Sequence, residues 1–429
     1  MPRKTLAMDF GTSNSAAAIL VGDTPMRIAV DDGYDTLPTA VFFPSDGTDM
    51  QIGRAASKAL IDGHEGRYMR ALKNVLGTSL FNESKLVGGK RQTLSDIVTA
   101  FIAMVKHRAE ITTGETFTHV LSGRPVHFHT SDPTRDARAQ SDLRACYLAA
   151  GFEQVTFMFE PEAAALASYQ HGQIGKIGLI VDIGGGTSDF SLFQRQDQGF
   201  EILASHGIRL GGTDFDHAVS MKHVMPLLGH GGTLRREFGD GLLPVPKAIY
   251  NDLATWAKIP FLYSHKTRLA TAQMAQLAVD QKAFARLQTL LDFELGHELA
   301  FAVERGKIAA NSETDTAPVQ PATIPMGFVE PGLAPALTKA SLDLTLQGFR
   351  NHLGTAAKET LRLAGVPENA VSNVILVGGS SLMQMVAAEM RLICPLANQS
   401  YSDAFTAVID GLARATAPLP AKSSPPGPL

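Results

Sequence analysis

The alternation of hydrophobic and polar positions along the chain predicts short strands separated by helices. Strand-like apolar runs occupy residues 5–10, 16–21, 39–44, 119–126, 154–159, 177–183, 190–193 and 373–379, and several are apolar enough to be buried on both faces. Helical spacing of apolar residues runs through 94–111, 133–151, 161–172, 214–229, 293–312, 344–365 and 383–393. Such alternation is typical of an α/β fold with mostly short loops.

Three stretches break this pattern. Residues 230–243 are polar and interrupted by glycine, and residues 314–326 indicate irregular or edge-strand structure, so we expect both in a less regular insert. Residues 418–429 read PLPAKSSPPGPL, which is rich in proline and too polar to pack against a core. This composition predicts a disordered tail.

Composition narrows the class of protein. The chain has 429 residues, 45% of them hydrophobic, which suffices for a large core and roughly two to three domains. A net charge of −4 creates no field that would attract nucleic acid or anionic lipid, and no run of eighteen apolar residues occurs, so we expect neither nucleic acid nor membrane as a partner. Cys146 and Cys394 lack metal-ligand spacing, and the first strand begins too early for a secretory signal. We therefore expect a cytoplasmic protein.

One local pattern occurs twice, as MDFGTSNS at 8–15 and as VDIGGGTSD at 181–189. In both copies an apolar run ends at an aspartate, Asp9 or Asp182, and a second apolar run follows the glycine and hydroxyl residues. Each copy therefore predicts a hairpin between two strands. The GxxxxGK[ST] phosphate loop is absent from the chain, and a dinucleotide-binding fingerprint would need its glycines to open a helix.

Such a hairpin can bind phosphate, because glycines permit a turned backbone whose N–H groups converge on one anion. A carboxylate beside phosphate is repulsive unless a cation lies between them, and Mg²⁺ held through waters by one or two carboxylates meets that need. The alternative interpretation is that both segments are ordinary tight turns. The matched pair favours a clamp for a nucleotide and Mg²⁺, made of two facing hairpins.

Further motifs narrow the comparison: FEPEAAALASYQHG at 159–172, GIRLGGTDFD at 207–216, ERGKIAANS at 304–312, VILVGGSS at 374–381 and LKNVLG at 72–77. In this order they resemble the nucleotide-binding domain of the heat shock protein 70 family, most closely its short YegD-like members, within the actin-like ATPase superfamily. The resemblance implies a duplicated, ribonuclease H-like α/β fold. Its two lobes, with four subdomains, would enclose ATP or ADP with Mg²⁺.

The resemblance also implies roles for individual residues. Asp9 and Asp182 would hold Mg²⁺, and the catalytic candidates are Lys73, Glu160, Asp182 and Asp189. The phosphates would contact Gly11, Thr12, Ser13, Asn14, Gly184, Gly185, Gly186 and Thr187. The rest of the nucleotide would contact Gly211, Gly212, Glu304, Lys307, Asn311, Gly378, Gly379, Ser380, Leu382 and Asp403.

Several of these residues also have a structural interpretation. Lys73 alone could be a solvated surface residue, and Glu160, just before Pro161, suits a helix N-terminus. Asp189 would either assist the attacking water or cap its hairpin. Glu304 and Lys307, one turn apart, also make an exposed helical ion pair.

The sequence also departs from the family pattern. Leu382 stands where the family commonly has an arginine over the adenine, and Asn311 where a serine often contacts the base. Adenine recognition is therefore expected to be looser than phosphate recognition.

Pro125 corresponds to the family's interdomain switch proline, whose arginine partner would be Arg135 or Arg138.

We expect lobe I to comprise 1–172 and 400–417, with an insert at about 36–92, and lobe II to comprise 173–399, with an insert at about 226–337. The expected function is a slowly ATP-hydrolysing, chaperone-like switch that acts on a protein partner or co-chaperone and lacks the family's peptide-binding domain. The alternatives with the same fold are a small-molecule kinase and a filament-forming ATPase.

Overall fold

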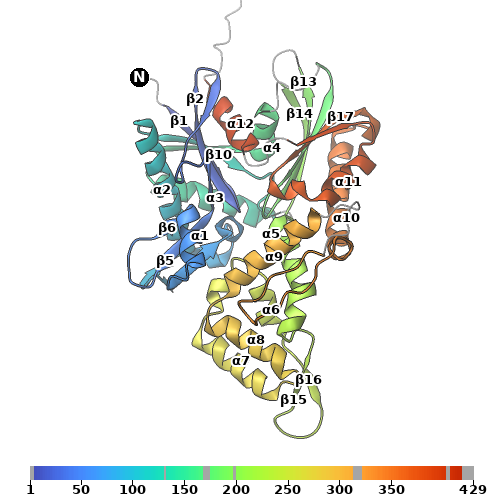
Figure 1. Ribbon diagram of the computed structural model, residues 1–429. Helices are drawn as coiled ribbons and strands as arrows, with labels where there is room; N and C mark the ends of the chain where they lie inside the picture. Colours follow the sequence, from blue (N-terminus) through green and yellow to red (C-terminus); the bar gives the residue numbers. More distant parts are fainter. Residues whose placement is uncertain are drawn as a thin grey trace, which may run out of the picture.

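The computed structural model describes residues 4–129, 132–167, 174–196, 200–312, 321–401 and 406–417. The predicted tail at 418–429, Asp403 and most of the stretch 314–326 lie outside these ranges. Two sheets form the centre of the molecule, one from each half of the chain (Figure 1). This confirms the predicted α/β class.

The first sheet has the strand order β11-β10-β1-β2-β3, with β4 paired to β2. Its members are β1 (Thr5–Phe10), β2 (Asn14–Val21), β3 (Thr24–Arg27), β4 (Thr36–Pro38), β10 (His119–Arg124) and β11 (Gln154–Phe159). Two helices, α2 (Leu94–Thr113) and α3 (Pro133–Ala149), contribute apolar residues such as Phe101 and Leu143 to the core beside this sheet. We call this unit the first lobe.

The second sheet has the order β14-β13-β12-β17-β18. Its strands are β12 (Ile177–Ile183), β13 (Ser188–Arg195), β14 (Phe200–Ile208), β17 (Val371–Val377) and β18 (Asn398–Tyr401). The helices around it are α5 (Gly212–Val219), α10 (Lys339–Ala364) and α11 (Gln384–Ile393). We call this unit the second lobe.

The two sheets repeat one arrangement around the predicted turns. β1 pairs antiparallel with β2 and places Asp9 opposite Ala16, while β12 pairs antiparallel with β13 and places Asp182 opposite Asp189. In both strands the aspartate is the second-last residue. Each hairpin therefore presents a carboxylate at the same place beside its glycine turn.

Two helices rich in small residues lie between the sheets: α4 (Glu160–Ala167) and α12 (Ala407–Ala415). Their apolar residues pack with residues of both sheets, including Ala7 of β1 and Ile180 of β12. At the crossing the backbones approach so closely that a Cβ on Gly411 would lie 1.7 Å from the Ala163 carbonyl oxygen. Small residues at this crossing allow α12 to pack against α4 and the first sheet.

The outer part of the first lobe holds β5 (Ala40–Pro44), β6 (Gln51–Ile52), β7 (Gly66–Arg70), β8 (Lys85–Val87), β9 (Lys90–Gln92) and α1 (Gly53–Ile61). The outer part of the second lobe holds β15 (Thr233–Arg235), β16 (Leu242–Pro244), α6 (Ala248–Leu253), α7 (His265–Leu277), α8 (Gln281–Asp292) and α9 (Gly296–Asn311). Figure 1 shows this second part extending below the rest of the molecule. The lobe and insert borders given above stay a prediction.

Several elements were not predicted from the pattern. The helices α1, α6, α7, α8 and α12 were missed, as were the strands β3, β4, β6, β7, β8, β9, β14 and β18. The strands β15 and β16 form a hairpin in the stretch expected to be irregular. α8 does carry a periodic buried face, Phe284, Leu287 and Leu291. In α1 the buried residues are Gly53, Ala56 and Ala59, so no large apolar residue makes a period visible. None of the described helices is long and apolar enough to cross a bilayer.

Candidate functional site

A cavity of about 480 Å³ lies between the two sheets, at the ends of β1 and β12. Its walls include most of the residues singled out from the sequence: Asp9, Gly11, Thr12, Ser13, Asn14, Lys73, Glu160, Asp182, Gly184, Gly185, Thr187, Glu304, Lys307, Asn311, Gly378, Gly379, Ser380 and Leu382. Residues from six distant parts of the chain thus meet around one space. Gly186, Asp189, Gly211 and Gly212 are not part of this wall, although Gly212 lines a smaller adjoining cavity.

The two hairpins face each other at contact distance. A Cβ on Gly185 would lie 2.5 Å from Ser13 Oγ and 3.1 Å from the Cβ of Thr12, so glycine is required for this approach. Gly378, directly after β17, has a φ of +82°, and a Cβ there would lie 2.7 Å from Asp182 Oδ1. The backbone N–H groups of both turns therefore border one concave space, an arrangement that suits a phosphate chain.

Lys73 enters the cavity from a short 3-10 helix, Leu72–Val75. Ala71 before it has a left-handed backbone, with φ of 58°, and Gly77 after it has φ of 73°. Such a backbone is unfavourable for alanine and is held here by its surroundings. The Lys73 ammonium lies 2.6 Å from Glu160 Oε1, at the start of α4, and both side chains are buried.

The cavity floor is strongly acidic. Burial and the nearby Glu160 raise the pKa of Asp9 to about 7, and the same causes raise the pKa of Asp182 well above its usual value. Burial opposes the charge of Lys73, but Glu160 and Asp9 together raise its pKa. The cluster therefore holds more potential negative charge than Lys73 can balance.

This imbalance fits a bound cation. Among the described residues no hydrogen-bond donor reaches the buried Oδ1 atom of Asp9. No three acidic, histidine or cysteine side chains in the described ranges converge closely enough to ligate one ion directly. Mg²⁺ keeps several of its waters and needs one or two carboxylates, so Asp9 and Asp182 suit it without a closer cage.

Two residues that the sequence argument missed line the outer end of the site. Arg70 lies 3.3 Å from Glu304 and stacks over Trp256 at 4.8 Å, and Asp216 lies 2.7 Å from the Lys307 ammonium. Glu304 and Lys307 are thus paired across elements and not with each other. Asp216 belongs to the GIRLGGTDFD motif, which was a usable signal, whereas no local pattern distinguished Arg70.

Asn311 and Leu382 lie together at the opening. The Asn311 amide donates to the Leu382 carbonyl at 3.1 Å and accepts from the Gln384 N–H at 2.8 Å. The Leu382 side chain is 48% exposed, and Ile308, which lines the same end, is 54% exposed. This end of the cavity is therefore apolar, and the Asn311 side chain is already engaged with the backbone.

Comparison with known proteins agrees with this geometry. A family model described as Hsp70 protein matches residues 5–228, which is more than half of the chain and includes both hairpins, Lys73 and Glu160. The chain belongs to the Hsp70 family. It is also 33% identical over 226 residues to the chaperone protein DnaK of Endomicrobium trichonymphae. That match covers 50% of this chain and 34% of the relative, so it spans about a third of the relative's length.

Membership of the Hsp70 family gives the two lobes the actin-like ATPase fold. Proteins of this family bind ATP or ADP, and the match supports a chaperone-type nucleotide-binding domain. The matched residues of this Hsp70 protein include both hairpins beside the cavity.

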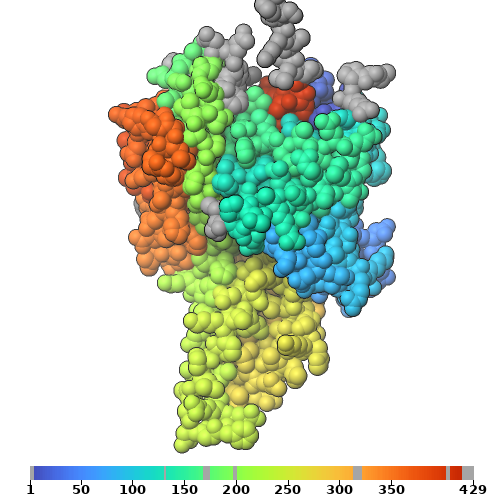
Figure 2. Space-filling view, turned by 180° about the vertical axis from the view of Figure 1, so that it is seen from behind, coloured from blue at the N-terminus to red at the C-terminus, as the bar shows by residue number. Residues whose placement is uncertain are grey.

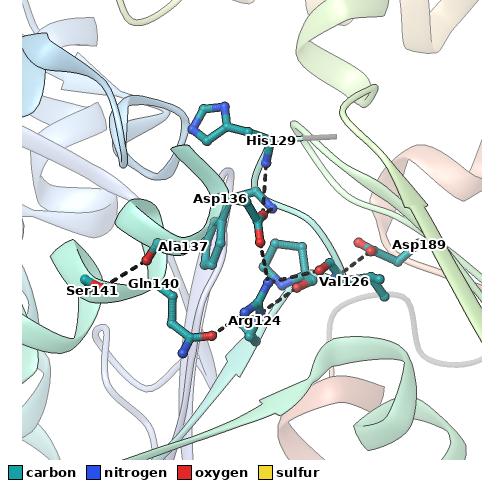
Figure 3. A network of polar contacts seen from close by, with 10 residues as sticks. Arg124, Val126, His129, Asp136, Ala137, Gln140, Ser141 and Asp189 are labelled. Carbon is teal, nitrogen blue, oxygen red and sulfur yellow. Dashed lines mark hydrogen bonds and ion pairs between the residues drawn. The ribbon is translucent and has the colours of Figure 1, made fainter. Parts of the chain in front are cut away.

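Asp189 lies behind the cavity and connects the lobes. Its Oδ1 atom accepts a hydrogen bond of 2.7 Å from the N–H of Val126 in the first lobe (Figure 3). Burial and Glu160 raise the pKa of Asp189 to about 8. A side-chain hydrogen bond with Thr187, in the turn of the same hairpin, acts in the opposite direction on this pKa. The two roles considered for Asp189 stay predictions.

The arginine beside Pro125 is Arg124. Its guanidinium donates to the carbonyls of Pro125 and Val126, both at 2.9 Å, and also reaches Gln140 and Asp136 (Figure 3). Arg138 is exposed on α3 and Arg135 lines a different cavity. In this Hsp70 protein the loop after β10 is thus held by the residue directly before the proline, a position that a comparison of spacing does not reveal.

Proposed function

We propose that this protein is a Mg²⁺-dependent ATPase whose slow hydrolysis switches the relation between its two lobes, and that it acts on a protein partner. The observation that carries the proposal is the buried Lys73–Glu160 pair between two facing hairpins that each present an aspartate. A lysine so placed provides a compact positive charge for a terminal phosphate.

Each group has one role in the proposed reaction. The backbone N–H groups of residues 11–14 and 184–187 bind the phosphates, and Lys73 stabilises the charge that develops on the transferred phosphoryl group. Asp9 and Asp182 would hold Mg²⁺, which when bound would supply positive charge beside the phosphate oxygens. Glu160 fixes the position of Lys73 and accepts a hydrogen bond from the attacking water.

The contacts between the lobes support a switch. Asp189 and Val126 join the lobes behind the cavity, and Arg70 and Glu304 join them in front of it. A change in the phosphates would act on both of these contacts, as in other closures around a ligand. Cys146 and Cys394 are free and buried, which supports a reducing compartment, proposed to be the cytoplasm.

The test combines two measurements on purified protein with Mg–ATP. We expect slow phosphate release without any added metabolite and without an increase in light scattering. Release that requires an added acceptor would instead indicate a kinase. Scattering that grows with ATP would indicate a filament former.

A further inference from the structure

Trp256, the single tryptophan of the chain, is buried where the outer parts of the two lobes meet. It lies between α6 and the 3-10 helix Ile259–Phe261, and it is 3% exposed. Figure 2 shows from behind that the blue atoms of the first lobe's outer part touch the yellow atoms of the second lobe's outer part. Trp256 also lines a small cavity of about 40 Å³ that adjoins the candidate nucleotide site.

Four charged side chains share this small cavity with Trp256: Arg70, Asp216, Glu304 and Lys307. Glu304 and Lys307 stand one turn apart on α9, a spacing at which opposite charges normally pair with each other. Each instead faces a residue of another element. Glu304 lies 3.3 Å from Arg70 of β7, and Lys307 lies 2.7 Å from Asp216 of α5. The two side chains are therefore held apart, and both also line the larger nucleotide cavity.

Trp256 contacts both of these partner residues. Its Nε1–H donates to Asp216 Oδ2 at 3.4 Å, and the Arg70 guanidinium lies over its ring, 4.8 Å from the centroid. Tryptophan combines one N–H donor with a large aromatic face, so one side chain can hold a carboxylate at its edge and a cation on its face. Phe301 of α9 packs against the ring at 5.1 Å and an angle of 76°, which fixes the orientation of the indole.

The separation of the α9 pair depends on Trp256, because the charges around the cavity can attract one another in more than one way. Burial opposes the charge of Arg70, but Glu304 and Asp216 are among the groups that raise its pKa, so both acidic residues attract it. Without the indole, Arg70 could move from Glu304 toward Asp216. The Oδ2 atom of Asp216 would also lose its N–H donor. Glu304 and Lys307 would then be free to pair along α9.

We propose that Trp256 is a positioning residue for the sugar of the bound nucleotide. Through Asp216 it directs the Lys307 ammonium toward the ribose hydroxyls. Through Arg70 it directs the Glu304 carboxylate toward them. Two neighbouring hydroxyls can both donate and accept hydrogen bonds, which a separated ammonium and carboxylate match. This inference rests on the proposed function, since it concerns the sugar of the nucleotide that the ATPase would bind.

The test compares the binding of ATP with the binding of dideoxy-ATP, which lacks both ribose hydroxyls, by calorimetry in the presence of Mg²⁺. Trp256→Phe keeps an aromatic ring for Arg70 but deletes the N–H that holds Asp216. We expect the affinity for ATP to fall about three- to tenfold, the effect of losing one hydrogen bond, and the affinity for dideoxy-ATP to change less than about twofold. The preference for ATP over dideoxy-ATP should therefore shrink.

Tyr250→Phe is the matched control. Tyr250 is also a buried aromatic residue in the outer part of the second lobe, and its hydroxyl donates to the Leu228 carbonyl at 3.1 Å. Neither of these two residues lines the nucleotide cavity. The control variant thus loses a buried hydrogen bond without disturbing the charged residues, and we expect it to keep the wild-type preference for ATP.

A double-mutant cycle tests whether Trp256 acts through Asp216. Asp216→Asn should also reduce the preference for ATP, and adding Trp256→Phe to it should reduce the preference no further, because both changes break the same series of contacts. Additive losses in the double variant would overturn the proposal. An unchanged preference in Trp256→Phe, or an equal loss in Tyr250→Phe, would overturn it as well.

Two further outcomes separate this inference from the proposed function. If the wild type binds ATP and dideoxy-ATP equally well, the sugar site is wrong while the proposed ATPase function stands. If the wild type binds neither nucleotide, both proposals are wrong.

Discussion

At the scale of single residues, the cavity floor concentrates charge that a folded protein normally avoids. Asp9, Asp182 and Glu160 surround Lys73 in a buried space, and one amine cannot balance three carboxylates. Buried like charges oppose folding unless protons or a bound cation neutralise them. Such a cluster is therefore more readily explained by ligand binding than by stability.

The first prediction concerns catalysis. Asp182→Asn keeps the shape of the side chain but removes its charge, so we expect phosphate release to fall by ~10²–10³, the usual effect of losing one positioned charge. Lys73→Ala should reduce it similarly. Asp292→Asn, at an exposed position on α8, is the matched control. Near-normal release from Asp182→Asn in a folded, nucleotide-binding protein would show that the site is misplaced.

A second prediction concerns stability and pH in the absence of nucleotide and metal. Because the pKa of Asp182 is raised on folding, the folded protein keeps a proton that the unfolded chain has already released above about pH 4. The carboxylate therefore lowers the free energy of unfolding increasingly as pH rises. Urea denaturation should show Asp182→Asn more stable than the wild type at pH 8, with a smaller gap at pH 5. A gap that does not change with pH would contradict the acidic cluster.

At the scale of elements, the two hairpins and the loop after β17 form the site. Gly185 brings the hairpins together, because a Cβ there would meet Thr12 and Ser13. Gly184 differs, since the nearest atom to a Cβ there is the Thr187 carbonyl oxygen at 3.8 Å. Neighbouring glycines of one turn thus have different structural requirements.

The third prediction uses that difference. Gly185→Val should force the hairpins apart and weaken ATP binding more than adenosine binding, because the disturbed groups face the phosphates. Thermal denaturation should show Gly184→Ala close to the wild type, which makes it the control for the fold of the turn. Equal losses of ATP and adenosine in Gly185→Val would indicate general misfolding.

The fourth prediction concerns the apolar end of the cavity. Leu382 and Ile308 offer no cation to stack on a base, so discrimination between ATP and GTP should be weak. Leu382→Arg would add a stacking contribution of about 0.5–2 kcal/mol and tighten ATP roughly three- to thirtyfold. Titrations of both proteins with ATP, ADP and GTP measure the effect. Unchanged or weaker binding of ATP by the variant would show that the base lies elsewhere.

At the scale of the whole molecule, the outer parts of the lobes touch in front of the cavity. Arg70 of β7 contacts Trp256 and Glu304, and the Tyr68 ring lies 4.8 Å from His297 at an angle of 81°. Burial lowers the pKa of His297 to about 3, so this ring is neutral and packs as an aromatic group. We therefore expect these contacts to slow the exit of a nucleotide from the cavity.

The fifth prediction follows from this closure. Arg70→Ala removes a stacked cation and a partly buried ion pair, together about 1–2 kcal/mol, so release of labelled ADP should accelerate roughly five- to thirtyfold. Stopped-flow displacement measures the rate. Arg91→Ala, at an exposed position of β9 in the same outer part, should leave the rate unchanged. Equal release rates in all three proteins would show that the contacts do not control exit.

Local sequence signals were sufficient to predict those elements whose structure depends mainly on neighbouring residues. The strand periods predicted both hairpins, which the structure confirms, and the position of Asp9 and Asp182 at the ends of two such strands predicted a phosphate and metal site there. The proline after Glu160 and the strong periods of α2 and α10 similarly predicted where those helices lie. The individual roles of the site residues stay predictions, because no bound nucleotide tests them.

Only the tertiary structure decided which distant side chains meet. Arg70 pairs with Glu304, Asp189 with the Val126 N–H, and Arg124 with the carbonyl of Pro125. Hydrophobic period and turn chemistry describe each segment relative to its own neighbours. The pairing of long polar side chains depends on how the two lobes pack. The local sequence pattern does not determine the distance between side chains of different lobes.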